Sequence, residues 1–179
     1  MMTAILEIPE VRRRVSPLTV AEYHRLDEFN ENGRRTELIR GVVIEKMSKS
    51  PLHCKLAKRL YDRISRLGGP GWVVRREDPL TLADSETEPD FAVIRGTEDE
   101  FANAHPQTAE LVIEVAVTSA ALDQEGATLY AEAGVKEYWI VLGAERQVEV
   151  YRVPEHGQYR DQKLFDIYPE RCPPWSDRF

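Results

Sequence analysis

Apolar positions along the chain follow two different spacings. Apolar residues three or four positions apart predict helices over about 18–33 and 52–68, and an alanine-rich stretch predicts a third over 120–134. Shorter apolar runs predict strands, and these lie at 36–47 (a hairpin turned at Arg40-Gly41), 72–76, 91–94, 110–117, 136–142, 147–153 and near 158–163. Helices and strands in this order predict an α/β fold with a mixed sheet flanked by helices.

The stretches between these elements suggest the organisation of the chain. Residues 1–17 predict a loosely held N-terminal arm, 18–167 a single domain, and the proline-containing residues 168–179 an irregular tail. Thr19 and Glu22 have the spacing of a capping box at the start of the first helix. Residues 79–89 predict a polar connection between two strands.

Two carboxylates stand in apolar runs, where a buried strand normally carries none. Asp90 opens the run at 91–94 directly after Pro89, and Glu114 lies between Ile113 and Val115. A buried carboxylate costs several kcal/mol unless a cation or hydrogen-bond donors meet it. We therefore expect the two acids to meet and to share a divalent metal. The alternatives are a turn residue for Asp90 and, for both acids, simple pairing with arginines such as Arg75 and Arg76.

The overall charge limits how the protein could bind nucleic acid. The net charge is −7, from 31 acidic and 24 basic residues, so binding would need a local basic patch. The exposed side of the predicted helix 52–68 offers one at Lys55, Lys58 and Arg59, although a merely solvated helix face has the same pattern. The chain has no apolar run of about 20 residues and no CxxC spacing, so we expect a cytoplasmic protein without a membrane span.

A series of motifs then carries a family resemblance. The stretches TELIRGVVIEKMS, PLHCKLAKRL, EPDFAVIRG, ELVIEVAVTS, YAEAGVKEYWIV and RQVEVYR occur in this order between residues 18 and 163. Together they resemble the Uma-two family of restriction-endonuclease-like proteins from bacteria, which is similar to the PD-(D/E)xK nuclease superfamily. No single stretch is specific, and the resemblance rests on the whole series.

The resemblance implies a restriction-endonuclease-like core that hydrolyses DNA with Mg²⁺ or Mn²⁺. Asp90 matches the aspartate of the PD motif and Glu114 its second acid, and these two would hold the metal. Glu37 matches an early glutamate of the family, and His53 the histidine that opens the following helix. Exposed sheet edges and the apolar Tyr138-Trp139 run also suggest a homodimer.

One departure from the pattern concerns a lysine. The superfamily places it two residues after the second acid, where this chain has Ala116. Many relatives instead place a lysine on the following helix, where this chain has Gly126 or Ala127. Gln124 could position a water there but carries no charge, and Lys136 lies nearby. Two functions therefore remain open: a nuclease with weakened activity, or an inactive nuclease fold that binds nucleic acid or a protein partner.

Overall fold

The structure is a computed structural model that describes residues 8–27, 33–67, 69–117 and 120–167. Its contacts divide the chain into two compact units, each described here by itself. One comprises Met1–Lys46 with Asp84–Glu86, and the other Met47–Ala83 with Thr87–Phe179. Residues 1–7 and the predicted tail 168–179 lie outside the described residues.

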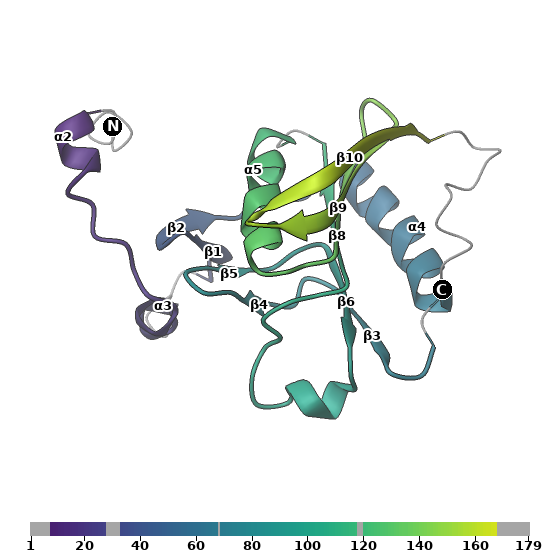
Figure 1. The fold of residues 1–179 in the computed structure, drawn as a ribbon, viewed down its shortest axis with the longest axis horizontal. Coiled ribbons are helices and arrows are strands. Elements are labelled where there is room, and N and C mark those ends of the chain that lie inside the picture. Colours follow the sequence, from purple (N-terminus) through teal and green to yellow (C-terminus); the bar gives the residue numbers. More distant parts are fainter. Residues whose placement is uncertain (1–7, 28–32, 68, 118–119, 168–179) are drawn as a thin grey trace. The chain divides into compact units, whose positions relative to one another are not determined.

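The larger unit is built on a six-stranded mixed sheet, which confirms the predicted fold class (Figure 1). The strand order is β10-β9-β8-β7-β6-β3; β7 and β8 pair in parallel and the other neighbours are antiparallel. The strands are β3 Trp72–Arg75, β6 Phe91–Arg95, β7 Leu111–Ala116, β8 Glu137–Leu142, β9 Gln147–Glu155 and β10 Gln158–Asp166. All six lie where the apolar runs predict them, although β10 is longer than expected.

Two helices cover the two faces of this sheet. Helix α4 (Pro51–Leu67) buries Ala57 and Ile64 against one face, and α5 (Ala120–Glu132) buries Leu129 and Tyr130 against the other. Helix α5 also forms the crossover between the parallel strands β7 and β8. Strands covered on both faces need apolar residues at successive positions, which is why β6, β7 and β8 read as near-continuous apolar runs.

The segment predicted as a polar connection at 79–89 is largely buried, so that prediction was wrong. It contains the two-residue strands β4 (Leu80–Thr81) and β5 (Glu86–Thr87), and Leu80 and Thr87 are both buried. Strands of two residues are too short for an alternating pattern of apolar and polar positions, so periodicity could not predict them. The loop after β6 contains a further short element, the 3₁₀ helix η1 (Glu98–Phe101).

The smaller unit contains α2 (Pro9–Arg12), α3 (Val20–Asp27), β1 (Thr36–Ile39) and β2 (Val42–Glu45). The predicted capping box forms: the Thr19 amide donates to Glu22 Oε2 (2.8 Å) and the Glu22 amide to Thr19 Oγ1 (3.2 Å). The predicted hairpin also forms, and Arg40 and Gly41 both adopt positive φ angles in its turn. Strand β1 pairs on its other side with Glu86 of β5. Helix α2 lies in the N-terminal arm, residues 1–17, which the sequence predicted to be loosely held.

The Tyr138-Trp139 run does not offer the surface expected of it. Both side chains are buried within the larger unit, Tyr138 at 0% and Trp139 at 4% exposure. This run therefore cannot support a homodimer, whereas β10 does form one end of the sheet order. No helix among residues 8–27, 33–67, 69–117 and 120–167 is long and apolar enough to cross a membrane.

Candidate active site

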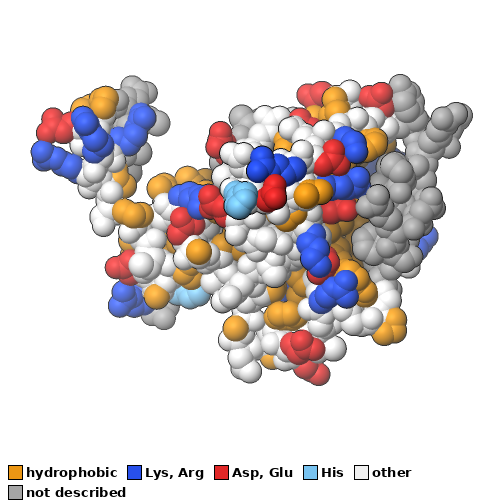
Figure 2. Space-filling view, viewed as in Figure 1, with side chains coloured by type: hydrophobic (Ala, Val, Ile, Leu, Met, Phe, Trp, Pro, Cys, Tyr) orange, Lys and Arg blue, Asp and Glu red, His pale blue; other side chains and the backbone are white. Residues whose placement is uncertain are grey.

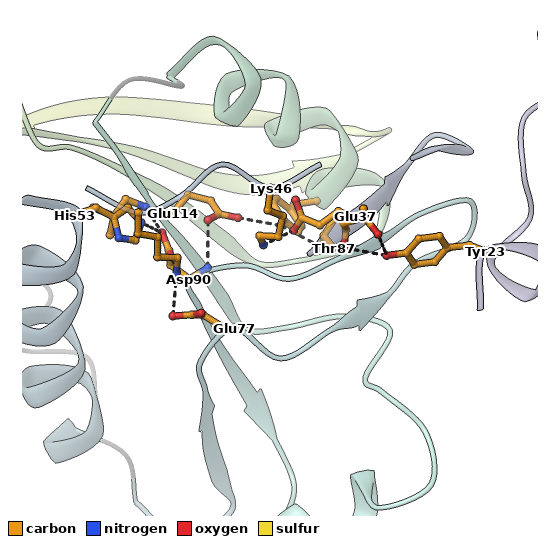
Figure 3. A network of polar contacts seen from close by, with 12 residues as sticks. Tyr23, Glu37, Lys46, His53, Glu77, Thr87, Asp90 and Glu114 are labelled. Carbon is orange, nitrogen blue, oxygen red and sulfur yellow. Dashed lines mark hydrogen bonds and ion pairs between the residues drawn. The ribbon is translucent and has the colours of Figure 1, made fainter. Parts of the chain in front are cut away.

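Asp90 and Glu114 lie side by side where β6 begins. The last paired residues of β6 and β7 are Phe91 and Ile113, so the next residue on each strand is one of the two acids. The Asp90 amide donates to Glu114 Oε2 (3.1 Å), and the Val115 amide donates to Asp90 Oδ2 (2.9 Å). The Asp90 side chain is 8% exposed. The structure thus brings together the two acids that the sequence singled out (Figure 3).

A lysine and a histidine meet the buried Asp90 carboxylate. Lys49 Nζ donates to Oδ1 (2.7 Å), and His53 Nε2 lies 2.9 Å from Oδ2. Because a carboxylate accepts hydrogen bonds, this contact places the ring proton on Nε2. The His53 amide donates to Ser50 Oγ (3.2 Å), which caps helix α4 and fixes the residue at its first turn. The other ring nitrogen, Nδ1, is buried without a hydrogen-bond partner among the described residues.

These contacts keep Asp90 ionised. Burial alone would raise its pKa, but hydrogen bonds from His53, Lys49 and the Val115 amide lower the pKa of Asp90 to about 2. Burial would likewise lower the pKa of Lys49, yet its hydrogen bonds to Asp90 and Glu77 raise that pKa above the ordinary value. The site is therefore a charged cluster at neutral pH, with an anion and a cation that stabilise each other.

The depressed pKa of Asp90 predicts a particular acid dependence of stability in the absence of metal. The folded pKa of about 2 lies below the ordinary value of 3.8, so the ionised carboxylate stabilises the fold fully above about pH 4. This contribution, roughly 2 kcal/mol, should be lost as the pH falls from about 4 to about 2. Urea unfolding in EDTA should show that the difference in free energy of unfolding between wild type and Asp90→Asn becomes smaller as the pH falls over that range. A difference that stays constant would contradict the depressed pKa of Asp90.

Glu114 and Glu77 complete the surroundings of Asp90. Tyr130 on α5 places its hydroxyl 3.3 Å from Glu114 Oε1 and 3.3 Å from Thr87 Oγ1, and its single proton can serve one acceptor at a time. Glu77 follows β3, and its Oε1 lies 2.9 Å from Lys49 Nζ. Lys49 and Glu77 were not singled out in the sequence. The one available signal for Lys49 was its position just before the helix start that carries His53.

The chain is similar to known proteins in sequence and in fold. Residues 20–170 match the family described as "Uma2: Putative restriction endonuclease". The chain belongs to this family. A solved structure described as a putative nuclease belonging to DUF820 from Anabaena variabilis has the same fold, with a TM-score of 0.71 and 23% identity. The alignment covers 84% of this chain and 85% of that one. No curated protein matches the chain.

The Uma2 chain differs from the expected nuclease pattern at each lysine position. Ala116 lies two residues after Glu114 on β7 and is buried in the core beneath α5. Gly126 lies on α5 one turn before Tyr130, and a Cβ built there would come 3.2 Å from the Tyr138 hydroxyl. Lys136 is bound to both oxygens of Glu110 (2.7 and 2.8 Å), at the opposite end of β7 from Glu114. None of these three positions presents an ammonium group to Asp90.

Two further residues suggested by the sequence have hydrogen-bond partners of their own. Glu37 belongs to the smaller unit, where its carboxylate accepts a hydrogen bond from Lys46 (2.8 Å). Gln124 is exposed on α5 and donates to Glu149 of β9 (3.0 Å). The arginines considered as partners of the acids have other contacts. Arg75 lies near Asp78 (3.6 Å) and His105 (3.3 Å), and Arg76 near Glu77 (3.5 Å).

Helix α4 presents an exposed basic face. Lys55, Lys58 and Arg59 are exposed, and within the described residues none of them forms an ion pair. Arg63 and Arg66 extend this face toward the end of the helix, interrupted only by Asp62. By contrast, on the face drawn in Figure 2, basic and acidic side chains are interspersed. This basic face begins at Lys55, two residues after His53 in the same helix.

The donor set of the site fits a hard divalent cation. Magnesium takes oxygen ligands, typically one or two carboxylates with several waters, and Asp90 and Glu114 supply two carboxylates. No three His, Cys, Asp or Glu side chains in the described part of the chain are grouped to hold a metal, so water or substrate would complete the coordination. Because Asp90 Oδ1 already accepts Lys49, a metal ion at that oxygen would compete with the ammonium group.

Proposed function

We propose that the protein is a metal-dependent endonuclease that hydrolyses DNA phosphodiester bonds. The observation that carries the proposal is the pair of buried Asp90 and half-buried Glu114 at the start of β6, in a chain of the family described as "Putative restriction endonuclease". Two neighbouring carboxylates, one of them buried, have a function if they bind the same divalent cation. A purely structural role would be served equally well by apolar residues of similar volume.

The residues around the pair have distinct roles in this proposal. Asp90 and Glu114 would hold Mg²⁺ or Mn²⁺, which would polarise a phosphoryl oxygen and make an attacking water more acidic. His53 and the Val115 amide fix Asp90 Oδ2, so the carboxylate has one orientation before substrate binds. Tyr130 similarly orients Glu114. Glu37 is proposed, from the family pattern alone, as a supporting acid.

Nicking of supercoiled plasmid tests the proposed activity. Wild-type protein with Mg²⁺ or Mn²⁺ should convert supercoiled DNA to the open circle, and EDTA should stop the reaction. Asp90→Asn protein purified in the same way controls for contaminating nuclease. Equal nicking by both proteins, or no nicking by the wild type, would contradict the proposal.

The basic face of α4 gives a second prediction, on DNA binding. We expect the triple variant Lys55→Gln/Lys58→Gln/Arg59→Gln to bind duplex DNA more weakly, because each phosphate contact releases counterions. If all three residues contact phosphates, the slope of log affinity against log salt should fall by about 2.7 in magnitude. Fluorescence anisotropy in EDTA, between about 50 and 200 mM salt, measures this without cleavage.

A matched control separates local contacts from net charge. Lys136→Gln/Arg160→Gln/Lys163→Gln removes the same number of charges from three exposed residues that are already ion-paired. This control should keep the wild-type salt slope. An equal loss of DNA affinity in both triple variants would show that binding depends on the net charge of the protein and not on the basic face of α4.

A second candidate function is an inactive nuclease fold that binds nucleic acid or a protein partner. Ala116 and Gly126 favour it, because neither position supplies the lysine expected of an active relative. When no cleavage is seen, calorimetric titration with Mn²⁺ shows whether the inactive fold still binds metal. Metal binding without nicking would indicate a retained pocket, and no binding would indicate that Asp90 and Glu114 serve the fold alone.

The proposal extends to the cellular compartment and the oligomeric state of the protein. We propose a cytoplasmic protein, since the exposed free thiol of Cys54 suits a reducing compartment. We also propose that it assembles as a homodimer, with β10 as the available sheet edge. Sedimentation at several concentrations tests the assembly.

A further inference from the structure

Lys49 occupies a position that nothing in the nuclease pattern assigns. It lies in the segment between β2 and α4, and its side chain is 23% exposed. Its ammonium group contacts Asp90 Oδ1 at 2.7 Å and Glu77 Oε1 at 2.9 Å. Lysine has three N–H donors, and the third has no acceptor among the described residues. An ammonium group with a free donor therefore lies directly at the carboxylate pair.

The charges of the site show what this ammonium group can do. Lys49 joins the carboxylates of Glu77 and Asp90, and Glu114 accepts the Asp90 amide. A phosphodiester that approached these acids without a cation would be repelled. The positions where relatives carry a lysine hold Ala116 and Gly126 in this chain. Lys49 is thus placed to offset the negative charge that develops on a phosphate at Asp90.

The backbone of Glu77 is strained. It has a φ of +56°, which side-chain-bearing residues rarely adopt, and its amide donates to the Pro89 carbonyl (3.1 Å). Strained backbone of this kind clusters at functional sites. The Glu77 carboxylate contacts Lys49, so it could retain the lysine if a metal ion bound the Asp90 oxygen.

We propose that Lys49 contacts the scissile phosphate and takes the part of the missing lysine, with Glu77 as its positioning residue. The inference rests on the proposed nuclease function. Lys49 donates a hydrogen bond to a non-bridging phosphate oxygen and stabilises the added negative charge as the water oxygen bonds to phosphorus and releases its proton to solvent. The phosphorus–ester oxygen bond breaks, and the leaving oxygen takes a proton from solvent. It remains an ammonium ion throughout, so no proton moves to or from it.

The test combines rate and metal affinity. We expect Lys49→Met to lower the single-turnover nicking rate at saturating plasmid by about 10²-fold, as for other lost oxyanion donors. Calorimetric Mn²⁺ affinity without DNA should stay equal or become tighter, because the competing ammonium group is gone. Lys49→Arg should keep a rate within about tenfold of wild type, and Lys136→Met, a lysine ion-paired away from the site, should have no effect.

Two further variants keep the test decisive if Lys49→Met folds poorly. Glu77→Gln leaves the lysine intact but weakens its anchor, so it should lower kcat and leave KM unchanged. Adding Gly126→Lys to Lys49→Met should restore part of the lost rate, since it returns an ammonium group to α5; Gly126→Ala in the same background controls for the helix.

The outcomes separate this inference from the function on which it rests. If the wild type nicks DNA, and Lys49→Met and Glu77→Gln both nick at rates within about twofold of it, the proposed role of Lys49 is overturned while the nuclease function stands. Loss of Mn²⁺ binding together with activity in Lys49→Met would also overturn it, because the residue would then be structural. No nicking by the wild type would overturn both.

Discussion

Asp90→Asn is expected to reduce metal-dependent plasmid nicking by about 10²- to 10³-fold or more, to background. Asparagine keeps the shape of the side chain but removes its charge, so the site loses the proposed metal ligand and the charged partner of Lys49 and His53 together. Its neutral amide oxygen cannot hold a divalent cation as a carboxylate does. Gel densitometry over a time course, with Mg²⁺ and Mn²⁺ in parallel, measures the loss.

The control for this prediction is a change of similar chemistry away from the site. Asp166→Asn lies on the exposed β10, where its carboxylate accepts only the Gln147 amide among the described residues (2.9 Å). It should nick at the wild-type rate. Mn²⁺ calorimetry should show weaker binding for Asp90→Asn alone. Unchanged metal affinity in Asp90→Asn would mean that the cation is held elsewhere.

Phe91→Ala is expected to lower the free energy of unfolding by about 3–5 kcal/mol. Phe91 follows the catalytic candidate directly, has no exposed surface, and stacks on Tyr61 of α4 with ring centroids 6.2 Å apart. Removal of its ring leaves a cavity between the sheet and the helix that carries His53. Urea unfolding should show a lower midpoint at an unchanged slope.

The companion variant Phe91→Leu tests whether the lost volume is the cause. It retains most of the apolar bulk and should cost much less than the alanine change. It should also keep nicking activity, since Asp90 and α4 remain in place. A loss below about 1 kcal/mol for Phe91→Ala would contradict the view that this ring holds α4 on the sheet.

The sequence predicted those parts of the molecule that depend on local pattern. The stripe of α4 and the apolar runs of β6, β7 and β8 follow from periodicity, and Asp90 and Glu114 were recognisable because they interrupt such runs. Lys49 and Glu77 have no such signal, because their roles arise only when β3 and the start of α4 meet at Asp90. The same holds for the buried residues of 80–87, whose polar composition suggested a loop.

The hydrogen bond from the Val115 amide to Asp90 has an evolutionary consequence. Strand β6 begins only at Phe91, so beyond that point a side-chain carboxylate, and not a neighbouring backbone, completes the bonding of β7. A descendant that had abandoned catalysis would still be selected to keep Asp90, because its loss leaves the Val115 amide, Lys49 and His53 without this acceptor. Retention of Asp90 alone in a lineage therefore does not record selection on the reaction, because a single substitution there already disturbs the fold. Whether a lysine is retained beside these acids records selection on the reaction.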